Sequence, residues 1–98
     1  MLFDWKRKDP YKGLEKFSQD PNGILVDVRI PEEYHLKHLD GAINIPLADI
    51  NNFQKYNDKH WYVYCLDGFR AEIAMYRLRN KGIPATNIGG IARYRFNS

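Results

Sequence analysis

The sequence predicts one α/β domain: a three-layer sandwich with a central, mostly parallel sheet of about five strands and helices on both faces. Short apolar runs typical of strands alternate along the chain with segments of helical periodicity. The run at residues 24–28 is almost continuously apolar, as strands buried on both faces are. The 98 residues suffice for one hydrophobic core, so we expect a single domain over residues 1–98.

Local signals place the helices in chain order. Asp9 and Pro10 mark the start of a first helix, and Pro31 with two glutamates behind it marks the start of a second. Spaced apolar residues predict a third helix around residues 47–53. A fourth begins at Arg70 and ends in basic residues followed by glycine and proline, as a helix C-terminus commonly does.

The strands are short and bounded by turn residues. We expect them at residues 24–28, 42–45, 61–65 and 85–88. Gly89 and Gly90 predict a tight turn after the last strand. The residues from there to Ser98 leave room for no more than a short helix or a tail.

Composition excludes several classes of protein. The net charge is +3, but the 15 basic residues are scattered among 12 acids, so we expect a solvated surface and no nucleic-acid partner. The first eight residues lack a long apolar core, and no run approaches the ~20 apolar residues that span a bilayer, so we expect no membrane partner. One cysteine excludes an internal disulfide framework and favours a reducing compartment, and we expect a cytoplasmic location. His35, His38 and His60 have no zinc-site spacing, so we expect no metal.

The stretch around Cys65 is the candidate active site. Cys65 ends a predicted strand, Gly68 lies in the short turn that follows, and Arg70 opens the next helix. The first N–H groups of a helix lack internal partners and its dipole is positive there, so this position would stabilise a thiolate. In open parallel sheets, ligands bind at the carboxyl ends of the strands, where Cys65 is expected to lie.

A simpler interpretation of Cys65 has to be weighed against this one. Most lone cysteines in soluble proteins are small buried hydrophobic residues with no chemical role. The coincidence of a cysteine, a glycine-containing turn, an arginine and a helix start favours a functional thiol here.

Three separated motifs together resemble the rhodanese family of single-domain sulfurtransferases over nearly the whole chain. Residues 27–34, DVRIPEEY, continuing through HLDGAINIP at residues 38–46, are similar to the family's first signature. Residues 64–71, YCLDGFRA, resemble its active-site loop of Cys, any two residues, Gly, any one and Arg. Residues 88–90, IGG, followed by Tyr94, are similar to its closing Gly-Gly and aromatic residue. The order and spacing of the motifs make the resemblance specific.

The resemblance implies sulfur transfer through a cysteine persulfide. Cys65 would take a sulfane sulfur from thiosulfate or a persulfide and pass it to a thiol or cyanide, with Arg70 adding positive charge or orienting the loop. The partners are then a small-molecule sulfur donor and a thiol acceptor, which can also be a sulfur-acceptor protein. No metal and no organic cofactor is expected. The loop that would bind the substrate and the persulfide consists of Leu66, Asp67, Gly68 and Phe69.

Four further residues of the first motif are expected to support the loops rather than to react. They are Asp27, Arg29, Glu33 and His38. Arg29 and Glu33 are four apart across a helix start, so we expect them to form an ion pair. His38 is expected to be a hydrogen-bonded structural histidine rather than a base.

The sequence departs from the family pattern at three positions. Asp67 puts a carboxylate inside the loop, where it would oppose an anionic donor such as thiosulfate. Lys37 stands where the family often has glycine, and Tyr94 stands where it often has tryptophan. We expect the fold to tolerate the last two changes.

Two alternative functions remain open from the sequence. Related folds use a Cys-to-Arg loop in phosphatases and arsenate reductases, but those loops have five intervening residues and this one has four, which favours a single sulfur over a tetrahedral oxyanion. The second alternative is a rhodanese-like regulatory or binding module without turnover, or a thiol redox sensor, since an exposed thiolate would also react with peroxide. Cys65 and Gly68 are both present, which argues against an inactive domain.

Overall fold

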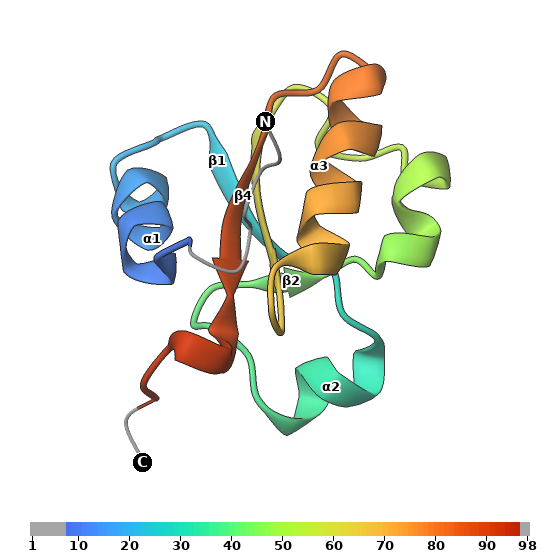
Figure 1. Ribbon diagram of the computed structural model, residues 1–98. Coiled ribbons are helices and arrows are strands. Elements are labelled where there is room, and N and C mark those ends of the chain that lie inside the picture. Colours follow the sequence, from blue (N-terminus) through green and yellow to red (C-terminus); the bar gives the residue numbers. More distant parts are fainter. Residues whose placement is uncertain (1–7, 97–98) are drawn as a thin grey trace, which may run out of the picture.

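A four-stranded parallel sheet forms the centre of the protein (Figure 1). The computed structural model describes residues 8–96. Neighbouring strands lie in the order β2-β1-β3-β4, and each pair is parallel, so β1 and β3 occupy the centre. The predicted parallel sheet is confirmed, but the described residues form four strands instead of about five. The strands are β1 (Gly23–Asp27), β2 (Ile43–Asn44), β3 (His60–Cys65) and β4 (Ala85–Gly90).

Helices cover both faces of the sheet and give the predicted three layers (Figure 1). One face carries α1 (Pro10–Ser18), together with side chains from α2 (Pro31–Leu36). The other face carries α3 (Phe69–Asn80) and the 3₁₀ helix η2 (Leu47–Asn52), which contact each other. The helix expected around residues 47–53 therefore exists, but as the tighter 3₁₀ form.

The central strands send alternate side chains to the two faces, as the two-residue period of a strand requires. Tyr62 and Tyr64 of β3 pack on the α1 side. Val63 and Cys65 pack on the α3 side, where Cys65 lies beneath the start of α3. The same alternation that builds the core therefore also sets the direction of the only cysteine.

The start of α1 agrees with the sequence. The Asp9 carboxylate accepts a hydrogen bond from the Tyr11 N–H at 2.9 Å, and Pro10 occupies the first helical position. Gly13 of this helix lies directly against Ile88 of β4, where a Cβ atom would collide with the isoleucine side chain. The missing side chain thus lets α1 approach the edge strand of the sheet.

The prediction of a tight turn at Gly89 and Gly90 is wrong. Both residues belong to β4 and pair with Tyr64 and Cys65, with an irregularity in register between Val63 and Tyr64. Gly89 has a φ of 109°, so the glycine accommodates a bulge in the strand and not a chain reversal. After β4 the chain turns into the short 3₁₀ helix η3 (Ile91–Arg93).

Some expectations fall at the ends of the chain. Residues 1–7 and 97–98 lie outside the described residues. The expectation that the first residues form no membrane segment, and the end of the predicted C-terminal tail, therefore stay predictions. Across residues 8–96, every helix is too short or too polar to cross a membrane.

Candidate active site

Cys65 is the last residue of β3, and the loop after it leads directly into α3. Gly68 is the N-cap of α3 and has a φ of 99°, a left-handed conformation that side chains other than glycine rarely adopt. This conformation turns the chain back over the cysteine within three residues. The helix begins at Phe69, one residue before the predicted start at Arg70.

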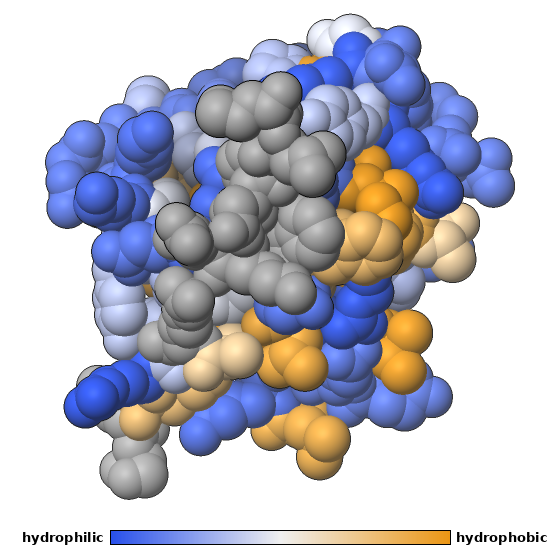
Figure 2. All heavy atoms as spheres, in the orientation of Figure 1, coloured by the Kyte–Doolittle hydropathy of each residue, from blue (hydrophilic) through white to orange (hydrophobic). Residues whose placement is uncertain are grey.

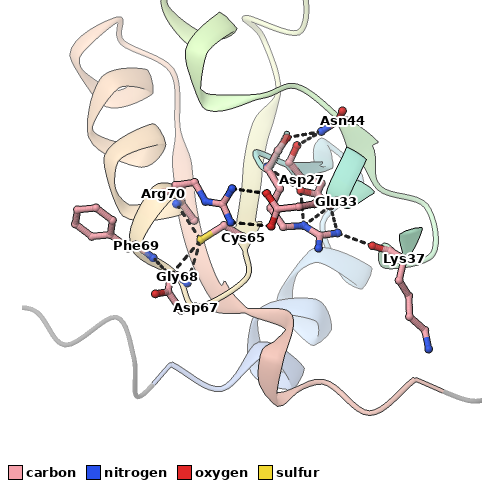
Figure 3. Close-up of polar contacts among 11 residues, drawn as sticks. Asp27, Glu33, Lys37, Asn44, Cys65, Asp67, Gly68, Phe69 and Arg70 are labelled. Carbon is pink, nitrogen blue, oxygen red and sulfur yellow. Dashed lines mark hydrogen bonds and ion pairs between the residues drawn. The ribbon is translucent and has the colours of Figure 1, made fainter. Parts of the chain in front are cut away.

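Two backbone amides point at the Cys65 sulfur (Figure 3). The Gly68 N–H donates to Sγ at 3.0 Å, and the Ala71 N–H donates to it at 3.5 Å. Both amides lie at the start of α3, where the helix dipole is positive. A sulfur that accepts two such donors is stabilised as an anion, which a purely structural cysteine does not require.

The Cys65 side chain is fully buried, with 0% relative exposure. The sequence had suggested an exposed thiol, and in this respect the structure agrees with the simpler interpretation of a buried cysteine. The reason is the tightness of the loop, because the chain that supplies the N–H groups also covers the sulfur. A molecule that reacts with Sγ would therefore reach it only when the loop or its side chains move aside.

The backbone of β4 closes the loop from behind. Gly90 lies so close to the loop that a Cβ atom would meet the Leu66 carbonyl oxygen and the Asp67 Cα. The Ala92 N–H also donates to the Leu66 carbonyl at 3.0 Å. Gly90, the second glycine of the closing motif, thus provides space for the loop after Cys65.

Asp67 holds the loop in shape as well as adding charge. Its Oδ1 atom accepts a hydrogen bond from the Phe69 N–H at 2.9 Å and thereby satisfies one of the unpaired donors at the helix start. The same oxygen lies 3.8 Å from Cys65 Sγ. Asp67 is exposed, so this negative charge borders solvent while the sulfur beside it is buried.

Apolar side chains flank this carboxylate at the loop. Leu66 is 47% exposed and Phe69 is 48% exposed. Figure 2 shows that hydrophilic side chains cover much of the face drawn, with smaller hydrophobic areas among them. The loop after Cys65 thus presents two large apolar side chains beside the Asp67 carboxylate.

Arg70 forms an ion pair with Glu33, which joins the start of α3 to α2 (Figure 3). The two guanidinium nitrogens Nη1 and Nη2 donate to the two carboxylate oxygens at 2.6 and 3.0 Å. These hydrogen bonds hold the pKa of Glu33 below its usual value and raise the pKa of Arg70. The hydrogen-bonding fork of Arg70 is thus directed at Glu33.

The expected ion pair between Arg29 and Glu33 is wrong. Arg29 instead binds Asp27, through Nε and Nη2 at 2.7 to 3.0 Å. Both partners are buried, with 5% exposure for Arg29 and 0% for Asp27. Glu33 faces the other way and is available to Arg70, because α2 begins at Pro31 and carries it toward α3.

The buried pair ties together the segments beside the site. Arg29 Nη2 also donates to the Lys37 carbonyl, and the Asn44 side chain donates to the carbonyls of Asp27 and Arg29 at 3.0 and 2.9 Å. Lys37 contributes its backbone here and has a φ of −169°, an extended conformation open to any residue. This explains why a lysine is tolerated where the family often has glycine.

Two aromatic positions also have structural roles. His38 Nδ1 contacts the Tyr34 carbonyl at 2.7 Å, and its ring stacks on the Tyr34 ring with centroids 3.7 Å apart. These contacts fit the predicted structural role of His38. Tyr94 stacks on Tyr11 of α1, with centroids 5.3 Å apart, so a tyrosine fills the position where the family often has tryptophan.

The sequence analysis missed two buried polar residues behind the loop, Glu72 and Asn87. Glu72 is 8% exposed and Asn87 is 1% exposed. Asn87 could have been noticed, because it interrupts an apolar strand pattern, whereas Glu72 resembles an ordinary exposed helix residue in the sequence. Among residues 8–96, no three His, Cys, Asp or Glu side chains gather as metal ligands would.

Comparison with known proteins agrees with this geometry. Residues 11–95 match the family described as "Rhodanese-like domain", and the chain belongs to this family. The solved rhodanese-like domain protein from Staphylococcus aureus superposes with a TM-score of 0.74 at 26% identity, covering 91% of this chain and 90% of that one.

Two curated relatives are larger proteins. The chain is 40% identical over 75 residues to a tRNA sulfurtransferase of Desulfurococcus amylolyticus, covering 76% of this chain and 15% of the relative. It is 30% identical over 99 residues to "Adenylyltransferase and sulfurtransferase uba4" of Ogataea parapolymorpha, covering 96% of this chain and 25% of the relative. The chain thus corresponds to one part of each of these proteins.

Proposed function

We propose that this protein is a rhodanese-type sulfurtransferase in which Cys65 carries the sulfur as a persulfide. The observation that supports this most is the pair of N–H groups, from Gly68 and Ala71, that point at Sγ. They act on the thiolate before the reaction and on the charged persulfide after the first transfer, as preorganised donors do at developing anions. Family membership and the sulfurtransferase names of relatives support the same reaction class.

The reaction needs two displacements at sulfur. The Cys65 thiolate attacks the outer sulfur of the donor, a new S–S bond forms, and the donor's own S–S bond breaks. Its electron pair leaves on a thiolate when the donor is a persulfide and on sulfite when the donor is thiosulfate. An acceptor thiolate then attacks the outer sulfur of the Cys65 persulfide and regenerates the Cys65 thiolate. No oxidant or reductant is consumed, because each S–S bond that breaks is replaced by another.

The charges around the loop favour a persulfide donor over thiosulfate. Asp67 places a carboxylate 3.8 Å from Sγ, and Arg70 is engaged by Glu33. A thiosulfate dianion would therefore approach an anionic entrance with its nearest cation already paired. Replacement of Asp67 by Asn removes the charge but keeps an oxygen for the Phe69 N–H, so it should raise the rate with thiosulfate about fivefold, as ~1 kcal/mol of repulsion predicts. An unchanged rate would remove this explanation of donor preference.

Several partners fit this site. The exposed Leu66 and Phe69 suit a donor or acceptor with an apolar portion, which includes the tail of a sulfur-acceptor protein. The proposed cycle uses no metal and no organic cofactor. A lone thiol that alternates with a persulfide is preserved in a reducing compartment, and we place the protein in the cytoplasm.

Intact mass spectrometry tests the proposed function. The protein is incubated with glutathione persulfide or with thiosulfate, and the mass is measured before and after addition of a thiol. One added sulfur atom that the thiol removes is expected on the wild type and not on Cys65→Ser. No added sulfur, with oxygen adducts under peroxide, would indicate a redox sensor, and no adduct under either condition would indicate a binding module.

A further inference from the structure

A buried polar pair lies behind the active-site loop, on the α3 side of the sheet. The Asn87 side-chain amide donates to the Glu72 Oε1 atom at 2.9 Å and to the Gly68 carbonyl at 3.1 Å. The Asn87 Oδ1 atom accepts from the Gly89 N–H at 2.8 Å. Only one orientation of the amide satisfies all three partners, since two of them are acceptors and one is a donor.

This pair is unusual for its surroundings. Asn87 lies opposite Val63 in the sheet, and the neighbouring residues on that face belong to the apolar core. A buried amide is costly unless it is hydrogen-bonded, so an aliphatic residue would be the ordinary choice for strand packing alone. The arrangement therefore calls for an explanation beyond packing.

The explanation lies in what Asn87 holds. The Gly68 carbonyl accepts from Asn87 and also from the Glu72 N–H at 3.0 Å, so two donors fix its direction. The N–H of the same residue donates to Cys65 Sγ. Gly68 is a left-handed glycine with no side chain to restrict it, so the Asn87 contact adds a restraint on the backbone that aims its N–H at the sulfur.

We propose that Asn87, oriented by Glu72, is a positioning residue that keeps the Gly68 N–H directed at the Cys65 sulfur. This inference deepens the proposed sulfur transfer and rests on it for its functional meaning. Asn87 itself touches neither the sulfur nor the substrate.

The rate of Cys65 alkylation by iodoacetamide tests this placement without any turnover. The ratio of the rates at neutral and at alkaline pH reports how well the surroundings stabilise the thiolate at neutral pH, while the alkaline rate corrects for access. In Asn87→Leu this ratio should fall about tenfold, which corresponds to a weakened hydrogen bond to a charged sulfur. The charged groups near Cys65 that the Asn87 variant leaves in place are Asp67, Arg70 with Glu33, Glu72, and the Asp27 and Arg29 pair.

Three further variants separate positioning from stability. Val63→Ala removes apolar contacts from the same face, so it should lower stability but leave the ratio unchanged. Glu72→Gln keeps an acceptor oxygen for Asn87 and should behave as the wild type, whereas Glu72→Leu should lower the ratio about threefold. If Asn87→Leu does not fold, the difference between Glu72→Gln and Glu72→Leu still decides the question.

The outcomes also separate this inference from the proposed function. A wild-type ratio in both Asn87→Leu and Glu72→Leu would overturn the positioning role, even if the wild type takes up sulfur. A lowered ratio in a protein that takes up no sulfur would keep the positioning role and overturn sulfur transfer.

Discussion

The two ends of the same sheet both carry polar networks, but the networks are built differently. At the amino end, Tyr62 donates to Asp20 at 2.6 Å, His60 contacts Thr86 at 2.7 Å, and His60 lies 3.6 Å from Asp20. Asp20, His60 and Thr86 are half-buried, and these side chains satisfy one another with the buried Tyr62. At the carboxyl end, backbone N–H groups converge on one buried sulfur and buried side chains hold the backbone from behind.

This difference distinguishes a network that only stabilises the fold from one that can act on a reactive atom. Mutual pairing between side chains fixes a turn and leaves no group available for a ligand. At the Cys65 end, by contrast, the donors point at an atom that can change its charge. We therefore expect substitutions at the amino end to affect stability alone, and substitutions at the carboxyl end to affect sulfur transfer as well.

The largest effect is expected on the free energy of unfolding, when Asp27 at the carboxyl end is compared with Asp20 at the amino end. Asp27→Asn leaves the buried Arg29 charge without its counterion and should lower the free energy of unfolding by about 3–5 kcal/mol. Asp20→Asn, at the amino end, should cost far less, because solvent screens its partners there. Urea unfolding of both variants measures the difference. Equal losses would show that the two ends are held with equal strength.

The next effect concerns Arg70 and is seen in rate more than in stability. Arg70→Ala removes a partly exposed ion pair, so the loss of stability should stay below about 1 kcal/mol. The rate of sulfur uptake should fall about tenfold, because a positive charge and the clamp at the start of α3 are lost together. Arg79→Ala, at the other end of the same helix, is the matched control and should keep the wild-type rate. A loss of rate in both variants would point to general loosening of α3.

A smaller effect is expected from two tyrosines on β3. Tyr62→Phe removes the hydrogen bond to Asp20 and should cost about 0.5–1.5 kcal/mol without changing the rate of sulfur uptake. Tyr64→Phe leaves the buried Leu39 N–H without its acceptor and should cost about 1–3 kcal/mol. The Tyr62 hydroxyl should also lose its proton at a higher pH than an ordinary tyrosine, because burial and the hydrogen bond to Asp20 raise its pKa to about 12. Ultraviolet absorbance during an alkaline titration measures this, with Tyr62→Phe as the reference.

The smallest effect is a pH dependence that comes from Glu33. Its pKa in the folded protein is lowered, first of all by the hydrogen bond from Arg70, so the pair contributes its full stability above the usual carboxyl value of 4.5. That contribution is lost as the pH falls below 4.5 and through the lowered pKa. Glu33→Gln should show a weaker decline of stability than the wild type over this range. Identical declines would show that Glu33 does not contribute.

The elements that the sequence predicts well are those fixed by neighbouring residues. Asp9 and Pro10 start α1, the apolar runs form β1 and β3, and the turn after Cys65 leads into α3. The family resemblance added the expected chemistry of the loop, and family membership is confirmed. These features depend on local propensity and on motif order, both of which can be read along the chain.

The features that the sequence did not predict depend on how distant segments meet. Glu33 pairs with Arg70 instead of Arg29 because α2 presents it to α3, a relation that spacing within one segment does not contain. Burial of Cys65 results from how tightly the loop and β4 close over it, and the strand conformation at Gly89 results from its pairing with Tyr64 of β3. The contact between Asn87 and Gly68 likewise joins residues that are 19 positions apart.

A crystal structure of the protein after reaction with glutathione persulfide tests the central claim most directly. We predict a second sulfur bonded to Cys65 Sγ and enclosed by the loop, with the Gly68 and Ala71 N–H groups still directed at the sulfur atoms. A persulfide turned out of the loop, or loop amides pointing away from it, would contradict this account.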